Sequence, residues 1–282
     1  MLVTSINLFF CNCLHSAEQF RSIHGMKLAI EIKDLSVTYS TGKHAFPALK
    51  NLNLQIPAGN VFGFLGPNGA GKTTAMHVLL GFIPPTSGSA TIFGTDVSQS
   101  IARQRIGYLA EHPNTYKFLT GRELLKAAGQ LFLIPKIKLD ERIEELLLQL
   151  DLEDAGNRRV GTYSRGMLQK ICIAEALIND PDLVILDEPT SGLDPISRKH
   201  IRDIIEGIKK QGKTVFFSSH ELSEVELVCD SLAILNKGEL VTTGPAATLV
   251  PKGESLERFF MQTVSRNTPS TNPQETLQPE AT

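Results

Sequence analysis

The fold of this chain is decided by one stretch of sequence, Gly66-Pro67-Asn68-Gly69-Ala70-Gly71-Lys72-Thr73. It fits the pattern G-x-x-x-x-G-K-S/T, in which glycines let the backbone curl and turn its N–H groups toward anionic oxygens. Lys72 can then reach the β- and γ-phosphates of a nucleotide, and the Thr73 hydroxyl can bind Mg²⁺. The alternative is a glycine-rich turn that has no ligand.

The flanking sequence favours the phosphate-binding interpretation. An apolar run at 61–65 predicts a strand before the stretch, and residues 74–80 predict a helix after it. A bound phosphate would then lie at a helix N-terminus, where free N–H groups and the helix dipole attract anions. The predicted phosphate-binding residues are Gly66, Pro67, Asn68, Gly69, Ala70, Gly71, Lys72, Thr73 and Thr74.

The composition disfavours nucleic-acid-binding, disulfide-rich and membrane-spanning classes of protein. Charged residues make up 21% of the 282 residues and the net charge is −2, so the chain lacks the basic field of a nucleic-acid binder. The four cysteines form no C-x-x-C pair, which favours a reducing compartment without disulfides or a metal site. We find no apolar run near the roughly 18 residues that span a bilayer.

The two ends of the chain differ from its middle. We expect residues 1–25 to be an extension outside the fold, because Met26 offers a second start and folded sequence follows it. Residues 26–263 are predicted to form one domain. Residues 264–282 are rich in Ser, Thr, Asn, Gln and Pro, which predicts a disordered tail.

Hydrophobic periodicity predicts an α/β fold. Its core is a parallel sheet, preceded by a β-rich part that forms an antiparallel subdomain and interrupted by a helical subdomain at about 112–180. Strands are predicted at 28–32, 35–39, 52–56, 61–65, 90–93, 105–109, 183–186, 214–217 and 231–235. Helices are predicted at 120–131, 140–150, 166–178 and 196–208.

Two acids, Asp187 and Glu188, follow the apolar run at 183–186. Ligands of open α/β sheets gather at the carboxyl ends of the strands, so both side chains would face the phosphate site. Asp187 is the predicted Mg²⁺ ligand, and Glu188 is predicted to orient or deprotonate an attacking water. The alternative is a pair of solvated acids in a turn.

Taken in order along the chain, these motifs resemble those of the ATP-binding subunits of ABC transporters. The resemblance covers roughly residues 27–262 and implies a P-loop NTPase core. Tyr163-Ser164-Arg165-Gly166-Met167 lies where that family has its signature Leu-Ser-Gly-Gly-Gln. The resemblance implies that Ser164 and Gly166 contact the γ-phosphate bound to a second subunit, while Arg165 and Met167 depart from the signature. A plain helix N-cap also explains Ser164.

The same resemblance assigns roles to four further residues. Tyr39 is similar to the aromatic residue that stacks on adenine, although ordinary strand packing also explains it. Glu111 occupies the place of a glutamine that helps to bind Mg²⁺ and senses the membrane partner; a surface acid is the alternative. Asp194 lies in a loop that passes between subunits, and it also suits a helix N-cap. His220 is similar to the histidine that contacts the γ-phosphate, so with Glu188 it is predicted to be catalytic.

The resemblance therefore implies an ATPase that uses ATP and Mg²⁺ and acts as a head-to-tail dimer with two nucleotides between the subunits. It implies separate transmembrane permease subunits, which Tyr116, Phe118 and Leu119 would contact, and a location at the cytoplasmic face of the membrane. The variant signature and Glu111 favour export. Two alternatives stay open: an ATPase of this family that acts on DNA or ribosomes, and a regulatory module that binds ATP without hydrolysing it.

Overall fold

The computed structural model describes residues 27–41, 44–251 and 253–266. The extension predicted at 1–25 lies outside these residues, as does the part of the predicted tail after 266. The tail was expected from residue 264 onward, whereas helix α10 (Leu256–Arg266) continues to Arg266. Within the described ranges, no helix is both long and apolar enough to cross a membrane.

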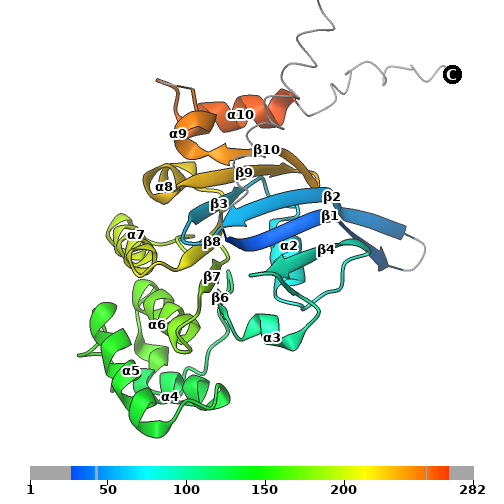
Figure 1. Cartoon of the computed structure of the whole chain (residues 1–282). Helices are drawn as coiled ribbons and strands as arrows, with labels where there is room; N and C mark the ends of the chain where they lie inside the picture. Colours follow the sequence, from blue (N-terminus) through cyan, green and yellow to red (C-terminus); the bar gives the residue numbers. More distant parts are fainter. Residues whose placement is uncertain (1–26, 42–43, 252, 267–282) are drawn as a thin grey trace, which may run out of the picture.

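The centre of the molecule is a six-stranded sheet (Figure 1). Its strand order is β10-β9-β3-β8-β7-β6, and β10 pairs antiparallel with β9 while the other neighbours are parallel. The strands are β3 (Val61–Leu65), β6 (Ile106–Leu109), β7 (Leu183–Leu186), β8 (Thr214–Ser219), β9 (Ser231–Asn236) and β10 (Glu239–Pro245). Strand β10 was not predicted from the sequence.

Both faces of this sheet are covered, which explains the continuous apolar run in β7. Leu183 and Ile185 belong to a core that includes α2 (Lys72–Leu79) and a second sheet. Val184 and Leu186 belong to a core formed with helices on the opposite face. Side chains alternate between the faces of a strand, so each face of β7 needs its own apolar residues.

The second sheet is antiparallel, with strand order β2-β1-β4-β5. Its long strands are β1 (Leu28–Thr41) and β2 (His44–Pro57), and its short ones are β4 (Ser87–Ile92) and β5 (Thr95–Asp96). The prediction of two separate strands at 28–32 and 35–39 was wrong, because β1 runs through Asp34 with shifts in its pairing to β2. Asp34 has a φ of 48°, so the irregularity is local and the strand continues.

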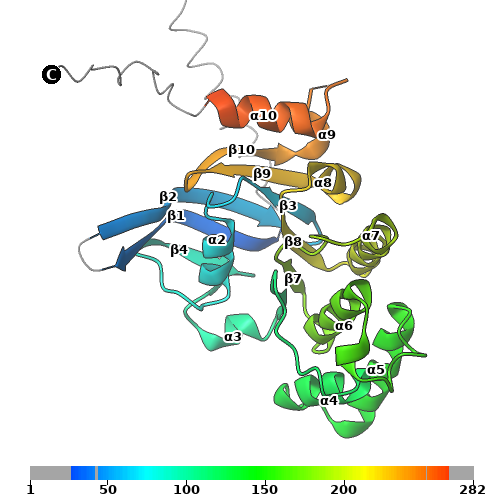
Figure 2. The same ribbon diagram turned by 180° about the vertical axis from the view of Figure 1, so that it is seen from behind.

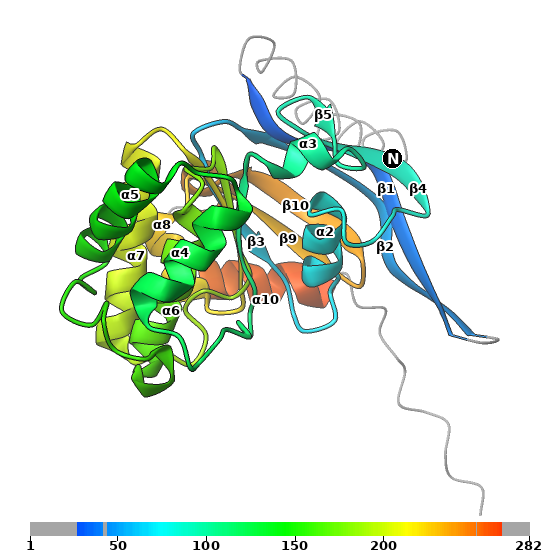
Figure 3. The ribbon, with the colours of Figure 1, turned by 90° about the horizontal axis from the view of Figure 1, so that it is seen from below.

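Three α-helices and a short 3-10 helix at Val160–Thr162 form the insertion between β6 and β7; the α-helices are α4 (Gly121–Leu131), α5 (Lys136–Gln149) and α6 (Arg165–Leu177). The predicted capping box of α4 is present, since Thr120 and Glu123 each bind the other's backbone N–H. Helix α5 begins at Lys136, earlier than the predicted residue 140. Figure 3 places this insertion and the antiparallel sheet on opposite sides of the molecule.

The remaining helices are short or lie on the outside. Figure 2 shows α9 (Ala246–Leu249) and α10 near the β10 edge of the sheet, far from the helical insertion, whereas α8 (Leu222–Val228) contacts β3, β8 and α10. Helix α7 (Pro195–Lys210) packs beside α8, and α3 (Ser100–Arg103) follows the antiparallel sheet. The observed architecture confirms the predicted α/β class with its antiparallel subdomain and helical insertion.

Candidate functional site

The glycine-rich stretch forms the predicted loop between a strand and a helix. β3 ends at Leu65, and α2 begins at Lys72 with Gly71 as its N-cap. Gly71 has a φ of 106°, and a Cβ there would lie 2.6 Å from the carbonyl oxygen of Ala48. A larger residue would meet both a strained backbone and a clash. The glycine thus allows the N-terminal N–H groups of α2 to open toward the site.

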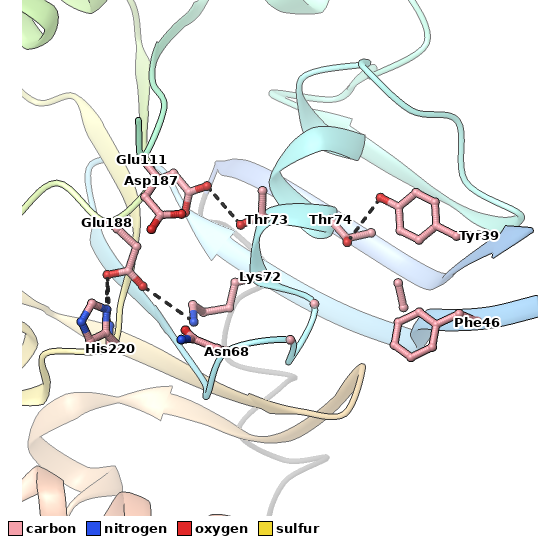
Figure 4. A pocket seen from close by; sticks show the side chains of 13 residues that line it. Tyr39, Phe46, Asn68, Lys72, Thr73, Thr74, Glu111, Asp187, Glu188 and His220 are labelled. Atoms are coloured by element: carbon pink, nitrogen blue, oxygen red, sulfur yellow. Dashed lines mark hydrogen bonds and ion pairs between the residues drawn. The ribbon is translucent and has the colours of Figure 1, made fainter. Parts of the chain in front are cut away.

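Lys72 is buried at the base of this loop and points at Glu188 (Figure 4). Its Nζ donates a hydrogen bond of 2.6 Å to the carbonyl oxygen of Gly66 and lies 3.7 Å from Glu188 Oε1. Both side chains are only 7% exposed. A buried cation and a buried anion that face each other offset part of the cost of removing each charge from water.

Asp187 connects the end of β7 to the start of α2. Its Oδ2 accepts a hydrogen bond of 3.1 Å from Thr73 Oγ1, and its Oδ1 accepts one of 2.5 Å from Ser218 Oγ. Ser218 was not predicted, although the run Ser218-Ser219-His220 at the end of a predicted strand was a usable signal. Carboxylate and hydroxyl oxygens side by side are the ligand type that Mg²⁺ prefers, so Thr73 and Asp187 fit that ion.

Glu188 and His220 form a second pair at the same edge of the sheet. His220 Nδ1 lies 2.7 Å from Glu188 Oε2, and the His220 backbone N–H donates to the same oxygen at 3.3 Å. The backbone of Glu188 has a φ of 51°, and its N–H is bound by Ser218 Oγ at 2.9 Å. Strained backbone at a buried carboxylate is a feature of functional sites.

These side chains line one cavity of about 340 Å³ (Figure 4). The cavity brings together most of the predicted residues. Its lining consists of Tyr39, Phe46, Ala48, Asn68, Gly69, Gly71, Lys72, Thr73, Thr74, Glu111, Asp187, Glu188 and His220. Gly66, Pro67 and Ala70 shape the loop behind it; Ala70, for example, is buried and its N–H binds the carbonyl oxygen of Pro67.

Two aromatic side chains stand at the open end of the cavity. Tyr39 and Phe46 are partners across the β1–β2 hairpin, and they are 41% and 64% exposed. Tyr39 Oη lies 3.4 Å from Thr74 Oγ1 at the start of α2. Phe46 was not predicted, because its place beside Tyr39 depends on the pairing of the hairpin. Exposed rings beside a phosphate loop offer a surface on which a base can stack.

The other end of the cavity is negatively charged. Glu111 lines it with Asp187 and Glu188, and its half-exposed carboxylate lies 3.9 Å from the His112 imidazole. Burial, together with the charges of Asp187 and Glu111, raises the pKa of the Tyr108 phenol to about 12. The structure thus places Glu111 where a cation bound by Thr73 and Asp187 would be attracted.

Ser164, Gly166 and Asp194 lie elsewhere: among the residues described, none of the three lines this cavity. Ser164 is the N-cap of α6, and its Oγ accepts the N–H of Met167 at 3.2 Å. A Cβ at Gly166 would lie 2.5 Å from Ser197 Oγ. Asp194 caps α7 through the N–H groups of Ile196 and Ser197, and hydrogen bonds from Ser197 hold the pKa of its carboxyl below the usual value.

Comparison with known proteins gives consistent results. The family model described as ABC transporter matches residues 49–191. An uncharacterized ABC transporter ATP-binding protein of Nostoc sp. is 48% identical over 75% of this chain and 64% of its own length. The chain thus spans less than two thirds of that relative. NatA of Bacillus subtilis, an ABC transporter ATP-binding protein, is 37% identical over 84% of this chain and 98% of NatA.

One further relative and two solved structures complete the comparison. The Nod factor export ATP-binding protein I of Rhizobium meliloti is 37% identical over 81% of this chain and 68% of that protein. An ATP-binding subunit of an ABC transporter matches with a TM-score of 0.75 and 28% identity, over 83% of this chain and 99% of its own. A dimeric post-hydrolysis state of the ATP-binding cassette MJ0796, bound to ADP and Pi, matches with a TM-score of 0.71 and 25% identity, over 77% and 98%. This chain belongs to the ABC transporter family and carries its ATP-binding domain.

Proposed function

We propose that this chain binds and hydrolyses ATP as a subunit of an ABC transporter and drives export through separate transmembrane permease subunits. The observation that carries the proposal is the convergence of Lys72, Asp187, Glu188 and His220 on one cavity beside the glycine-rich loop. They come from the start of α2 and from the ends of two neighbouring strands. This is where a parallel α/β sheet holds a phosphorylated ligand.

ATP fits the cavity from its aromatic end to its acidic end. Adenine would stack on Tyr39 and Phe46, and the phosphates would lie on the loop N–H groups between Asn68 and Thr74. Thr73, Asp187 and Glu111 would hold Mg²⁺, which supplies charge neutralisation at the phosphates when bound. Lys72 would then exchange its bond to the Gly66 carbonyl for the terminal phosphates.

Glu188 is the group that orients the attacking water and accepts its proton. The carboxylate is buried, so few other water molecules compete for it. Lys72 on one side and His220 on the other fix its two oxygens. His220, which is half-exposed, would contact the γ-phosphate at the mouth of the cavity.

A second copy of the chain completes the site. Ser164, Gly166 and Asp194 are the remaining predicted contacts, and they lie outside the cavity of their own chain. A head-to-tail dimer would bring Ser164 of one subunit to the γ-phosphate on the other, with two nucleotides between the subunits. The dimeric ADP- and Pi-bound cassette MJ0796 supports this arrangement by its similar fold.

The membrane partner would contact the segment after Glu111. Tyr116 and Phe118 are 62% and 69% exposed and pack edge to face, whereas Leu119 is half-buried against the helical core. The first two are therefore the better contacts for permease subunits, which would hold the chain at the cytoplasmic face of the membrane. The Nod factor export relative supports export as the direction.

The test is release of phosphate from ATP by the purified chain with Mg²⁺. We expect turnover whose rate rises more steeply than linearly with protein concentration, because two copies form the site. Lys72→Ala, which removes the buried ammonium group, is the inactive control. Phosphate release no faster than in this control would contradict the proposal. Co-purification from membranes, followed by identification of the bound proteins, tests the permease partner separately.

A further inference from the structure

Residues 189–194 form the loop that connects Glu188 to α7. Three backbone carbonyl oxygens of this loop accept hydrogen bonds from side chains. Pro189 O accepts a hydrogen bond of 2.9 Å from Gln169 Nε2. Ser191 O accepts one of 3.0 Å from an Arg165 Nη atom. Leu193 O accepts one of 2.9 Å from Arg198 Nε. Alternate carbonyl oxygens of the loop, at 189, 191 and 193, are thus each bound by a side chain.

Arg165 and Gln169 both belong to α6, the helix that Ser164 caps. They are four positions apart, so they lie on the same face of the helix. The guanidinium of Arg165 also packs closely on Gly192, where a Cβ would lie 2.4–2.5 Å from three of its atoms. Gly192 has a φ of 64°, and the absence of a side chain leaves room for the arginine. One face of α6 is therefore fitted to this loop.

Arg198, which donates to the carbonyl oxygen of Leu193, also links the loop to the segment that contains His220. Arg198, at the start of α7, forms an ion pair with Glu221, the residue after His220. Glu188, at the beginning of the loop, has the strained backbone and the bond to His220 described above. Backbone in such a conformation persists only where the surroundings hold it, and the clamped loop is the segment that follows it directly.

We propose that Arg165 is a positioning residue for Glu188. It fixes the 189–194 loop to the first turn of α6. The distance and orientation between the N-cap residue Ser164 and the carboxylate of Glu188 are thereby held constant. A second subunit that binds at Ser164 thereby acts on the geometry of Glu188. Arg165 stands where the family signature has a glycine. Its contact with Gly192 gives this substituted side chain a positioning role. The inference rests on the proposed function, because it needs Glu188 to act in hydrolysis.

The test compares Arg165→Ala, Arg165→Lys and the control Arg258→Ala, in which an exposed arginine of α10 is removed. We expect Arg165→Ala to lower kcat about 10-fold, since a charged hydrogen bond is lost, and to change KM for ATP less than about 2-fold. Arg165→Lys keeps one donor and should recover part of the loss. Arg258→Ala should match the wild type. Thermal melting of each variant verifies that it is folded, as the exposed position of Arg165 leads us to expect.

The decisive step repeats Arg165→Ala in a Glu188→Gln background. If Arg165 acts through Glu188, the second substitution adds little to the loss in single-turnover hydrolysis, and ATP-driven dimer formation is unchanged. An equal further loss, or weaker dimer formation, would overturn the inference in favour of a direct contact across the subunits. An unchanged kcat in Arg165→Ala alone would also overturn it. Normal hydrolysis by Glu188→Gln would instead remove the assignment of the base, which is a failure of the proposed function.

Discussion

Predicted nucleotide contacts lie in two regions of the molecule, the cavity and the N-termini of α6 and α7. The two regions differ in whether their side chains already surround a space for a ligand. In the cavity, Lys72 and Glu188 face each other across 3.7 Å, and Asp187 and Thr73 are already hydrogen-bonded. At the start of α6 and α7, Ser164 and Asp194 use their side chains as helix caps. The first region has charged groups around a cavity with space for a ligand, whereas the second consists of satisfied polar groups at a surface.

In the proposed dimer, this difference would divide the nucleotide contacts between two copies of the chain. A chain that held every contact in one cavity would be able to close on ATP alone. Here the groups proposed to polarise the phosphates are preorganised, and the groups proposed to cover them belong to another part of the surface. In the proposed head-to-tail dimer, association would be required before the γ-phosphate is enclosed, which would link the hydrolysis step to the motion of two subunits.

The largest effect is expected inside the cavity. Glu188→Gln removes the proposed proton acceptor and keeps the shape of the side chain, so hydrolysis should fall by roughly 10²–10⁴-fold while ATP binding is retained. Phosphate release and equilibrium ATP binding measure the two properties separately. Glu206→Gln, an exposed position on α7, is the matched control and should leave both unchanged. Normal hydrolysis by the Glu188 variant would place the base elsewhere.

A smaller effect is expected in the second region, where the cap and the proposed contact must be separated. Ser164→Ala and Thr120→Ala each remove an N-cap side chain. Each should lower the free energy of unfolding by about 0.5–2 kcal/mol. Ser164→Ala should in addition lower turnover by about 10- to 100-fold, because it loses a bond to a charged phosphate. Urea unfolding and phosphate release distinguish the two effects. Equal turnover in both variants would show that Ser164 acts only as the N-cap of α6 and makes no contact with the nucleotide.

The smallest effect concerns the aromatic end of the cavity. Phe46→Ala should raise the dissociation constant of ATP by about 5- to 70-fold, since stacking on one ring contributes roughly 1–2.5 kcal/mol. Binding of inorganic tripolyphosphate, which has no base, should not change. Phe118→Ala removes an equally exposed phenylalanine that lies outside the cavity and serves as control. A loss of tripolyphosphate binding in Phe46→Ala would point to damage of the loop itself.

Much of the fold and the cavity was predictable because local patterns determine it. The glycine-rich loop requires left-handed backbone at Gly69 and Gly71, and both have positive φ. The apolar run in β7 needs two covered faces, and it has them. Asp187, Glu188 and His220 follow strands of one parallel sheet, so their convergence at one edge follows from topology.

The residues that were missed depend on contacts between distant segments. Phe46 reaches the cavity because β1 and β2 pair with Phe46 opposite Tyr39, and that register includes shifts that no local pattern encodes. Ser218 holds Asp187 and Glu188 from the neighbouring strand, over a separation of about 30 positions. Helices α8 and α10 are short or amphipathic elements whose burial depends on tertiary packing.

Mixing one inactive and one impaired variant in equal amounts tests the central claim, that one active site is built from two chains. Lys72→Ala damages only the cavity, and Ser164→Ala damages only the covering region. In a head-to-tail dimer of one chain of each kind, one of the two sites contains neither change. Random association should therefore restore about a quarter of the wild-type phosphate release, if the two sites act independently. A mixture that is no more active than its separate components would contradict the account.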